Sequence, residues 1–303
     1  MIDTVLDDIT AAFVAALQGG TALLGTFSLP LLGVLGVIAF YWRLGPALAA
    51  GEAGMGDAMA GTLLYTIVAG ATYWILSNFI PMAQAAFDTF FGWGIAVSGF
   101  SAGDLSHPSV VMTLAAHAIA PQKSFIDRLI GWGKVFDFDH VVNFDIAGWI
   151  VWLAMLFLAL HQMMLIIEWN LALLAATVLI PWGLLSPTAF LAEVAVGWIG
   201  GNLVRLLVTG AFMGIAIPLF QGVATTDLSA SNGDPSMYQH FLLAAVAVVF
   251  AILAWVIPGR AAWMVGRGLG LTGNSIVGAA AGTARFYLLG GSLIRGASRM
   301  LRS

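Results

Sequence analysis

The chain contains no cysteine and very little charge. Among its 303 residues there are 11 lysines and arginines and 15 aspartates and glutamates, whereas 60% of the residues are hydrophobic. The absence of cysteine excludes disulfide scaffolds, thiolate metal sites and cysteine nucleophiles. Because about one quarter of a soluble domain is charged, this chain lacks the polar residues needed to cover a surface in water. Most of it is predicted to lie in lipid.

Acidic residues are missing from one whole segment, residues 258–303, which carries six arginines. Lysine and arginine accumulate on the cytoplasmic flanks of membrane helices. This segment is therefore predicted to be a cytoplasmic tail, rich in glycine and alanine as well as arginine. Within it, Arg295, Arg299 and Arg302 fall on one face of a helix, which predicts contact with the inner leaflet or with an acidic cytoplasmic partner.

Long apolar runs are abundant. A transmembrane helix needs about 20 mostly apolar residues, and such windows occur at 21–42, 58–80, 146–167, 199–220 and 241–257. The predicted fold class is an all-α polytopic membrane protein with five transmembrane helices, or six if one further segment also crosses. Amphipathic or interfacial helices are expected between them.

The uncertain sixth segment follows Glu168, Trp169 and Asn170, which interrupt the apolar run between Ile146 and Leu185. One helix of about 40 residues would be twice as long as the bilayer core is thick. We therefore expect two antiparallel segments joined by a tight polar turn, the second being too short to cross.

Five regions follow from this pattern: an acidic N-terminal segment (1–20), the first two transmembrane helices (21–80), a large extramembrane loop with aromatic-rich helices (81–143), a transmembrane bundle (144–257) and the tail (258–303). Arg43 favours a cytoplasmic first link, which places the N-terminal segment and the large loop on the non-cytoplasmic side of the membrane. Three bases in the loop favour the opposite side and six spans, but bases deep in a loop of about 60 residues orient helices weakly.

Three short motifs resemble functional sites but lack the required context. Residues 99–103 match G-x-S-x-G around Ser101, yet no buried strand precedes them. Residues 268–273 match G-x-G-x-x-G without a βαβ unit. An acidic cluster is formed by Asp137, Asp139, His140 and Asp145. Its side chains could bind a divalent cation, but a solvated loop explains them as simply. We therefore expect no catalytic set, no cofactor and no metal site, and a protein that is not an enzyme.

Charged or polar side chains inside membrane spans are costly and usually functional. His161 and Arg205 are the candidates, with Glu168 and Glu193 at the ends of spans, although Arg205 could instead extend to the lipid headgroups. One functional hypothesis is therefore a transporter or channel that uses Arg205, His161 and Glu193. A weaker one is an intramembrane hydrolase that uses Ser101.

The order of the segments resembles the TrbL family of bacterial type IV secretion and conjugation systems. The resemblance covers most of the chain and includes Phe-Phe-Gly-Trp-Gly at 90–94, His-Pro-Ser at 107–109 and Val-Ile-Pro-Gly-Arg-Ala-Ala at 256–262. The long hydrophilic C-terminal extension of many family members is not seen. The likeness lies in the overall layout of the segments.

The resemblance implies a multi-pass subunit of the bacterial inner membrane, without enzymatic activity, that forms an oligomeric base for pilus or stalk assembly and for translocation of DNA and protein. It implies these partners: further copies of the chain in a pentamer, the minor pilus-tip or stalk subunit, other inner-membrane subunits and ATPases, phospholipid, and the transferred DNA or protein. Because exposed apolar side chains mark contact surfaces, Phe90, Phe91 and Trp93 are predicted to contact subunits or lipid.

Overall fold

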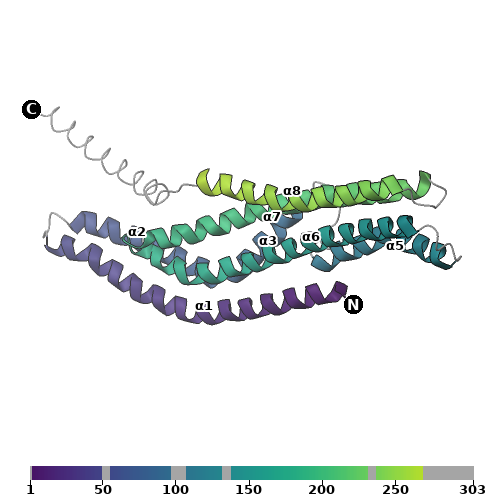
Figure 1. Cartoon of the computed structure of the whole chain (residues 1–303). Helices are drawn as coiled ribbons and strands as arrows, with labels where there is room; N and C mark the ends of the chain where they lie inside the picture. The colour runs from purple at the N-terminus through teal and green to yellow at the C-terminus, as the bar shows by residue number, and fades with distance from the viewer. Residues whose placement is uncertain (1, 50–54, 97–106, 132–137, 231–236, 269–303) are drawn as a thin grey trace, which may run out of the picture.

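The computed structural model describes residues 2–49, 55–96, 107–131, 138–230 and 237–268, which are almost entirely helical and include no strand (Figure 1). In chain order the elements are α1 (Ile2–Ala49), α2 (Met55–Ser77), α3 (Phe79–Ala96), α5 (Pro108–Gly131), α6 (Phe138–Leu179), the 3-10 helix η3 (Ile180–Leu184), α7 (Ala189–Ala230) and α8 (Met237–Gly268). The predicted all-α fold is confirmed.

Five of these helices, α1, α2, α6, α7 and α8, are long and apolar enough to cross a membrane. The end of α1 and the start of α2 lie at one end of the elongated molecule and α8 runs towards that end, whereas α6 and α8 begin at the other end (Figure 1). The helix ends thus alternate as five crossings require. Which end faces the cytoplasm stays a prediction.

The predicted polar turn in the middle of α6 is wrong. Residues 138–179 form one continuous helix, and the chain reverses about ten residues later than expected, through η3 and residues 185–188. The polar residues do not break α6 because each is accommodated by packing: Trp169 is buried, Asn170 donates to the carbonyl of Ile166 at 2.9 Å, and Glu168 forms an ion pair with Arg205. Pro181, in the first turn of η3, ends α6 instead.

Helix α1 begins earlier than the predicted first span. Its apolar stretch runs from Thr4 to Trp42, so the acidic N-terminal segment is continuous with the span and is not a separate element. Apolar residues between and after the aspartates, such as Leu6 and Val14, continue the helical pattern, and Leu6 is buried in the core.

Helices α2 and α3 are separated by a break at Asn78. Pro81 has no N–H to bond the carbonyl of Ser77, so a regular helix cannot continue through this point. The Asn78 side chain donates to the carbonyl of Trp74 at 2.9 Å and stabilises the end of α2. Beyond the break, α3 packs along α7, so part of the segment predicted as a large loop belongs to the helical bundle.

The main core lies between α3, α5, α6, α7 and α8, with the first turns of α1 against it. The closest approach within it joins α3 to α7 at Gly94 and Gly210. A Cβ added to Gly94 would lie 2.3 Å from the carbonyl oxygen of Leu207, and one on Gly210 would lie 2.7 Å from that of Phe91. Only glycine permits backbones to approach this closely.

Candidate functional site

A polar layer crosses the bundle between α6 and α7, inside the apolar stretches of both helices. Its centre is the ion pair between Arg205 of α7 and Glu168 of α6, whose side chains retain 19% and 27% of their accessible surface. Because charges in this position are stable only when paired or hydrated, the pair fixes α6 and α7 relative to each other. Arg205 therefore has a protein partner.

Three further polar side chains of this layer are more deeply buried. His161 of α6 is 2% exposed, Asn202 of α7 is 5% exposed and Thr209 of α7 is fully buried. Within the described part of the chain, no hydrogen-bond partner is found for either imidazole nitrogen, the Asn202 amide nitrogen or the Thr209 hydroxyl. Buried polar atoms normally have partners, so these atoms are the places where ordered water or a ligand group would bind.

His161 has an aromatic ring and a charged side chain near it. Its ring centroid lies 5.4 Å from that of Trp255 of α8, and Arg205 is within electrostatic range. On α7, Asn202, Arg205 and Thr209 are spaced three and four residues apart, so they share one side of the helix. The polar groups of the layer therefore come from α6 and α7, and Trp255 of α8 packs beside them.

Glu193 does not belong to this layer. It precedes Arg205 by twelve residues on the same continuous helix, a separation of about 18 Å at 1.5 Å per residue. The partner that the sequence did not assign to Arg205 is Glu168, which was expected in a turn. A usable signal was present, since opposite charges in neighbouring apolar helices are expected to pair.

The three aromatic residues predicted as a contact surface lie in α3 and differ in exposure. Phe91 is buried and its ring centroid lies 5.9 Å from that of Phe87. Trp93 is exposed, and its ring contacts half-buried Phe90 at 5.4 Å. Phe91 is thus part of the core of one chain, while contact of Phe90 and Trp93 with lipid or another subunit stays a prediction.

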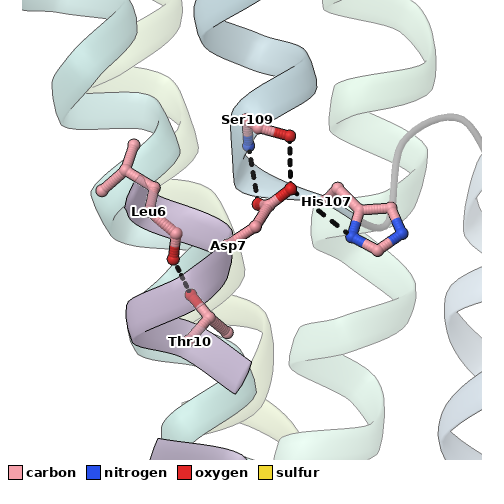
Figure 2. Close-up of polar contacts among 5 residues, drawn as sticks. All are labelled: Leu6, Asp7, Thr10, His107 and Ser109. Atoms are coloured by element: carbon pink, nitrogen blue, oxygen red, sulfur yellow. Dashed lines mark hydrogen bonds and ion pairs between the residues drawn. The ribbon is translucent and has the colours of Figure 1, made fainter. Parts of the chain in front are cut away.

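Asp7 joins the start of α1 to the start of α5 (Figure 2). Its carboxylate accepts hydrogen bonds from the Ser109 backbone N–H, at 3.0 Å, and from the Ser109 hydroxyl, while His107 Nδ1 lies 3.7 Å away. A carboxylate bound to the first N–H groups of a helix acts as an N-cap. Because the serine hydroxyl is bonded to the carboxylate and not to the imidazole, this group is a structural link and not a nucleophile activated by a base.

Other predicted site residues lie outside the described residues. These are Ser101, most of the G-x-G-x-x-G motif after Gly268, and the tail arginines Arg295, Arg299 and Arg302. Of the acidic cluster, Asp145 has a described side chain, and it is exposed. Where side chains are described, no group of three or more histidines, aspartates or glutamates is arranged to hold a metal ion.

Comparison of the chain with protein-family models, with curated proteins and with solved structures finds no significant match. The functional inference therefore depends on the residues themselves and on how the helices bring them together.

Proposed function

We propose that the protein is a non-enzymatic subunit of a type IV secretion or conjugation machine in the bacterial inner membrane. In this proposal, copies of the chain form an oligomeric base for pilus or stalk assembly and for translocation of DNA and protein. The observation that carries the proposal is a large apolar surface on the transmembrane helices. It is not buried within one chain, and it is too long to be covered by one bilayer.

The apolar surface is concentrated on α1 and α2. Only 22% of the residues in the most apolar window of α1 are buried, and only 11% in that of α2. Large side chains such as Val37 and Leu63 are exposed by 69% and 68%. Contiguous exposed apolar surface of this kind requires lipid or a protein partner.

Helix length argues that lipid alone is not enough. The apolar stretches of α1, of α6 together with η3, and of α7 contain 39, 43 and 36 residues, which is about 54 to 65 Å at 1.5 Å per residue. The bilayer core is about 30 Å thick, and even a tilt of about 40° reduces the shortest stretch only to about 41 Å. Protein neighbours are needed for the remainder, as in an oligomeric assembly.

The resemblance described above supplies the kind of assembly. Phe-Phe-Gly-Trp-Gly at 90–94 and Val-Ile-Pro-Gly-Arg-Ala-Ala at 256–262 support the secretion subunit, and the arginine-rich tail supports an inner-membrane location with the C-terminus in the cytoplasm. The expected neighbours are the minor pilus-tip or stalk subunit, other inner-membrane subunits and the ATPases.

The test combines oligomeric state with identity of the neighbours. Because the chain has no cysteine, Val37→Cys introduces a single thiol on the exposed face of α1, and Leu206→Cys introduces one at a fully buried control position. We expect a photoactivatable cross-linker attached to the thiol to join copies of the first variant and not of the second. We also expect secretion ATPases or pilus subunits to co-purify from native membranes.

Two results would contradict the proposal. One is a strictly monomeric particle both in detergent and in lipid nanodiscs, with no cross-link at position 37. The other is unchanged conjugative or secretory transfer after deletion of the gene in its native host.

A transporter or channel is the second candidate, favoured by the buried polar atoms of His161, Asn202 and Thr209 that have no partner among the described residues. Flux of a solute or ion through proteoliposomes that falls after His161→Phe would support it. Loss of substrate transfer in cells without any flux in proteoliposomes would favour the secretion subunit.

A further inference from the structure

A cavity of about 290 Å³ lies between α1, α3 and α6. Its polar wall is formed by Gln18 and Thr21 of α1, Gln84 and Asp88 of α3, and Asn170 of α6. Since each water molecule takes about 30 Å³ of the liquid, the cavity has room for about ten non-hydrogen atoms. It can hold a small ligand or the headgroup of a larger one.

The carboxylate of Asp88 is the charged group of this cavity. It is exposed, and within the described part of the chain nothing donates a hydrogen bond to it or forms an ion pair with it. No basic side chain is among the described residues that line the cavity. Among the described residues, Asp88 therefore has no countercharge.

The depth of Asp88 makes this lack costly. Helix α3 runs along α7, with Phe79 packed against the cluster that includes Ala195 and with Gly94 against Gly210. Asp88 thus lies near the level of Arg205, well inside the apolar stretch Ala189–Ala224 of α7. A carboxylate at such a depth needs a cation or water beside it.

The neighbouring polar groups are arranged to accept hydrogen bonds. The Thr21 hydroxyl already donates to the carbonyl of Leu17 at 2.8 Å, so its lone pairs remain available. The Asn170 amide nitrogen donates to the carbonyl of Ile166 at 2.9 Å, which leaves its Oδ1 as an acceptor. Together with the carboxylate, they complement a positively charged donor with several N–H groups.

Aromatic rings form the apolar wall beside the carboxylate. Phe87 and Trp169 both line the cavity, and their ring centroids are 5.9 Å apart. Organic ammonium groups are attracted to the faces of aromatic rings, tryptophan above all. An aromatic wall next to a carboxylate therefore favours an organic cation over a small metal cation, whose oxygen ligands would have to surround it.

We propose that the cavity between α1, α3 and α6 binds a primary ammonium group, with Asp88 as its counterion and Thr21 and Asn170 as hydrogen-bond acceptors. The group is supplied either by the ethanolamine headgroup of a membrane lipid or by a small free amine. This binding is independent of whether the chain belongs to a secretion machine.

The full chain in nanodiscs tests the proposal, with phosphatidylethanolamine, phosphatidylcholine and phosphatidylglycerol as separate probes and retained lipid measured by native mass spectrometry. We expect preferential retention of phosphatidylethanolamine, because choline has no N–H to donate and glycerol has no positive charge. Asp88→Asn should reduce this retention at least about tenfold, as expected for loss of a charge-assisted hydrogen bond.

The matched control is Asp145→Asn, which removes an exposed carboxylate of α6 that does not line the cavity. It should leave retention unchanged. Thr21→Val removes one acceptor without changing charge and should lower retention a few-fold. Asp88→Glu keeps the carboxylate and should still retain phosphatidylethanolamine in preference to the other two lipids. Equal thermal unfolding midpoints for the variants show that each is folded.

Titration with free ethanolamine, followed by fluorescence and by displacement of lipid, separates the two sources. Saturable binding in the absence of phosphatidylethanolamine identifies a free amine, and retention of the lipid that ethanolamine does not displace identifies a headgroup. Equal retention of all three lipids without ethanolamine binding would overturn the proposal, as would unchanged binding by Asp88→Asn.

Discussion

Helices α6 and α7 bury 44% of the residues in their most apolar windows, whereas α1 and α2 bury 22% and 11%. All four are long and apolar enough to cross a membrane. For α1, whose mean hydropathy of 2.2 is close to the 2.3 of α6, the difference lies in what packs against the helix and not in composition. One part of the molecule forms its own core, and the α1–α2 pair leaves most of its surface for lipid or another protein.

Glycines show the same contrast at the level of single atoms. Gly210 of α7 and Gly94 of α3 touch each other's backbones, so a side chain on either would clash. A Cβ added to Gly61 or Gly70 of α2 would meet nothing within 4 Å. Within the core, small residues thus allow two helices to approach closely. On α2, no described residue packs against Gly61 or Gly70.

The largest expected effect comes from breaking the charged pair of the core. Arg205→Ala leaves the Glu168 carboxylate partly buried without a partner, which should lower the free energy of unfolding by about 3 kcal/mol. Arg260→Ala, which removes an exposed arginine of α8, is the control and should change it by less than about 0.5 kcal/mol. Denaturant unfolding in mixed micelles measures both.

A double variant distinguishes the cost of an unpaired charge from the cost of lost packing. Replacing Arg205 and Glu168 together by methionine should restore stability to within about 1 kcal/mol of the original chain, because no uncompensated charge remains. A double variant as unstable as Arg205→Ala alone would show that packing around the pair, and not the unpaired charge, is responsible.

The next effect is steric. Gly210→Ala places a Cβ 2.7 Å from the carbonyl oxygen of Phe91 and should destabilise the protein by about 1 to 3 kcal/mol. Gly201→Ala, nine residues earlier on the same helix, has nothing within 4 Å and should be neutral or slightly stabilising, since alanine favours helix. Similar melting temperatures for the two variants would show that α3 and α7 are not in close contact.

A smaller effect is expected where α2 is attached to α1. The Tyr65 hydroxyl donates to the carbonyl of Gly36 at 2.8 Å, and Tyr65 is buried between the two helices. Tyr65→Phe should cost about 1 kcal/mol and should raise hydrogen exchange in α2 more than in α7. Equal changes in both helices would mean that α2 unfolds only with the core.

The smallest loss of stability is expected on the open face of α2. Gly70→Leu adds a side chain where no described residue lies within 4 Å, so it should not lower the free energy of unfolding of the single chain and should raise it by up to about 1 kcal/mol, because leucine favours helix over glycine. If α2 contacts another copy, the same substitution should reduce the oligomer seen by native mass spectrometry. An unchanged oligomer would place the subunit contact elsewhere.

The apolar runs of the sequence predict five or six spans, and the structure has five helices long and apolar enough to cross a membrane; the prediction fails at one point inside them. Glu168, Trp169 and Asn170 are a sound signal for a polar interruption, but the sequence does not show that Arg205, 37 residues later, supplies the partner for Glu168. Likewise, Phe91 and Trp93 lie in the same apolar motif, yet only the packing of α3 on α7 makes Phe91 buried and leaves Trp93 exposed.

The scarcity of charge and the long apolar runs by themselves determined that this chain is a helical membrane protein with five candidate spans, because transfer of apolar helices into lipid is a local property of each segment. Tertiary structure alone decided which polar groups meet: Glu168 with Arg205, Asp7 with the start of α5, and Asp88 with the acceptors of the cavity. These contacts join distant segments, and their energies depend on distance and burial, which exist only once the helices have packed.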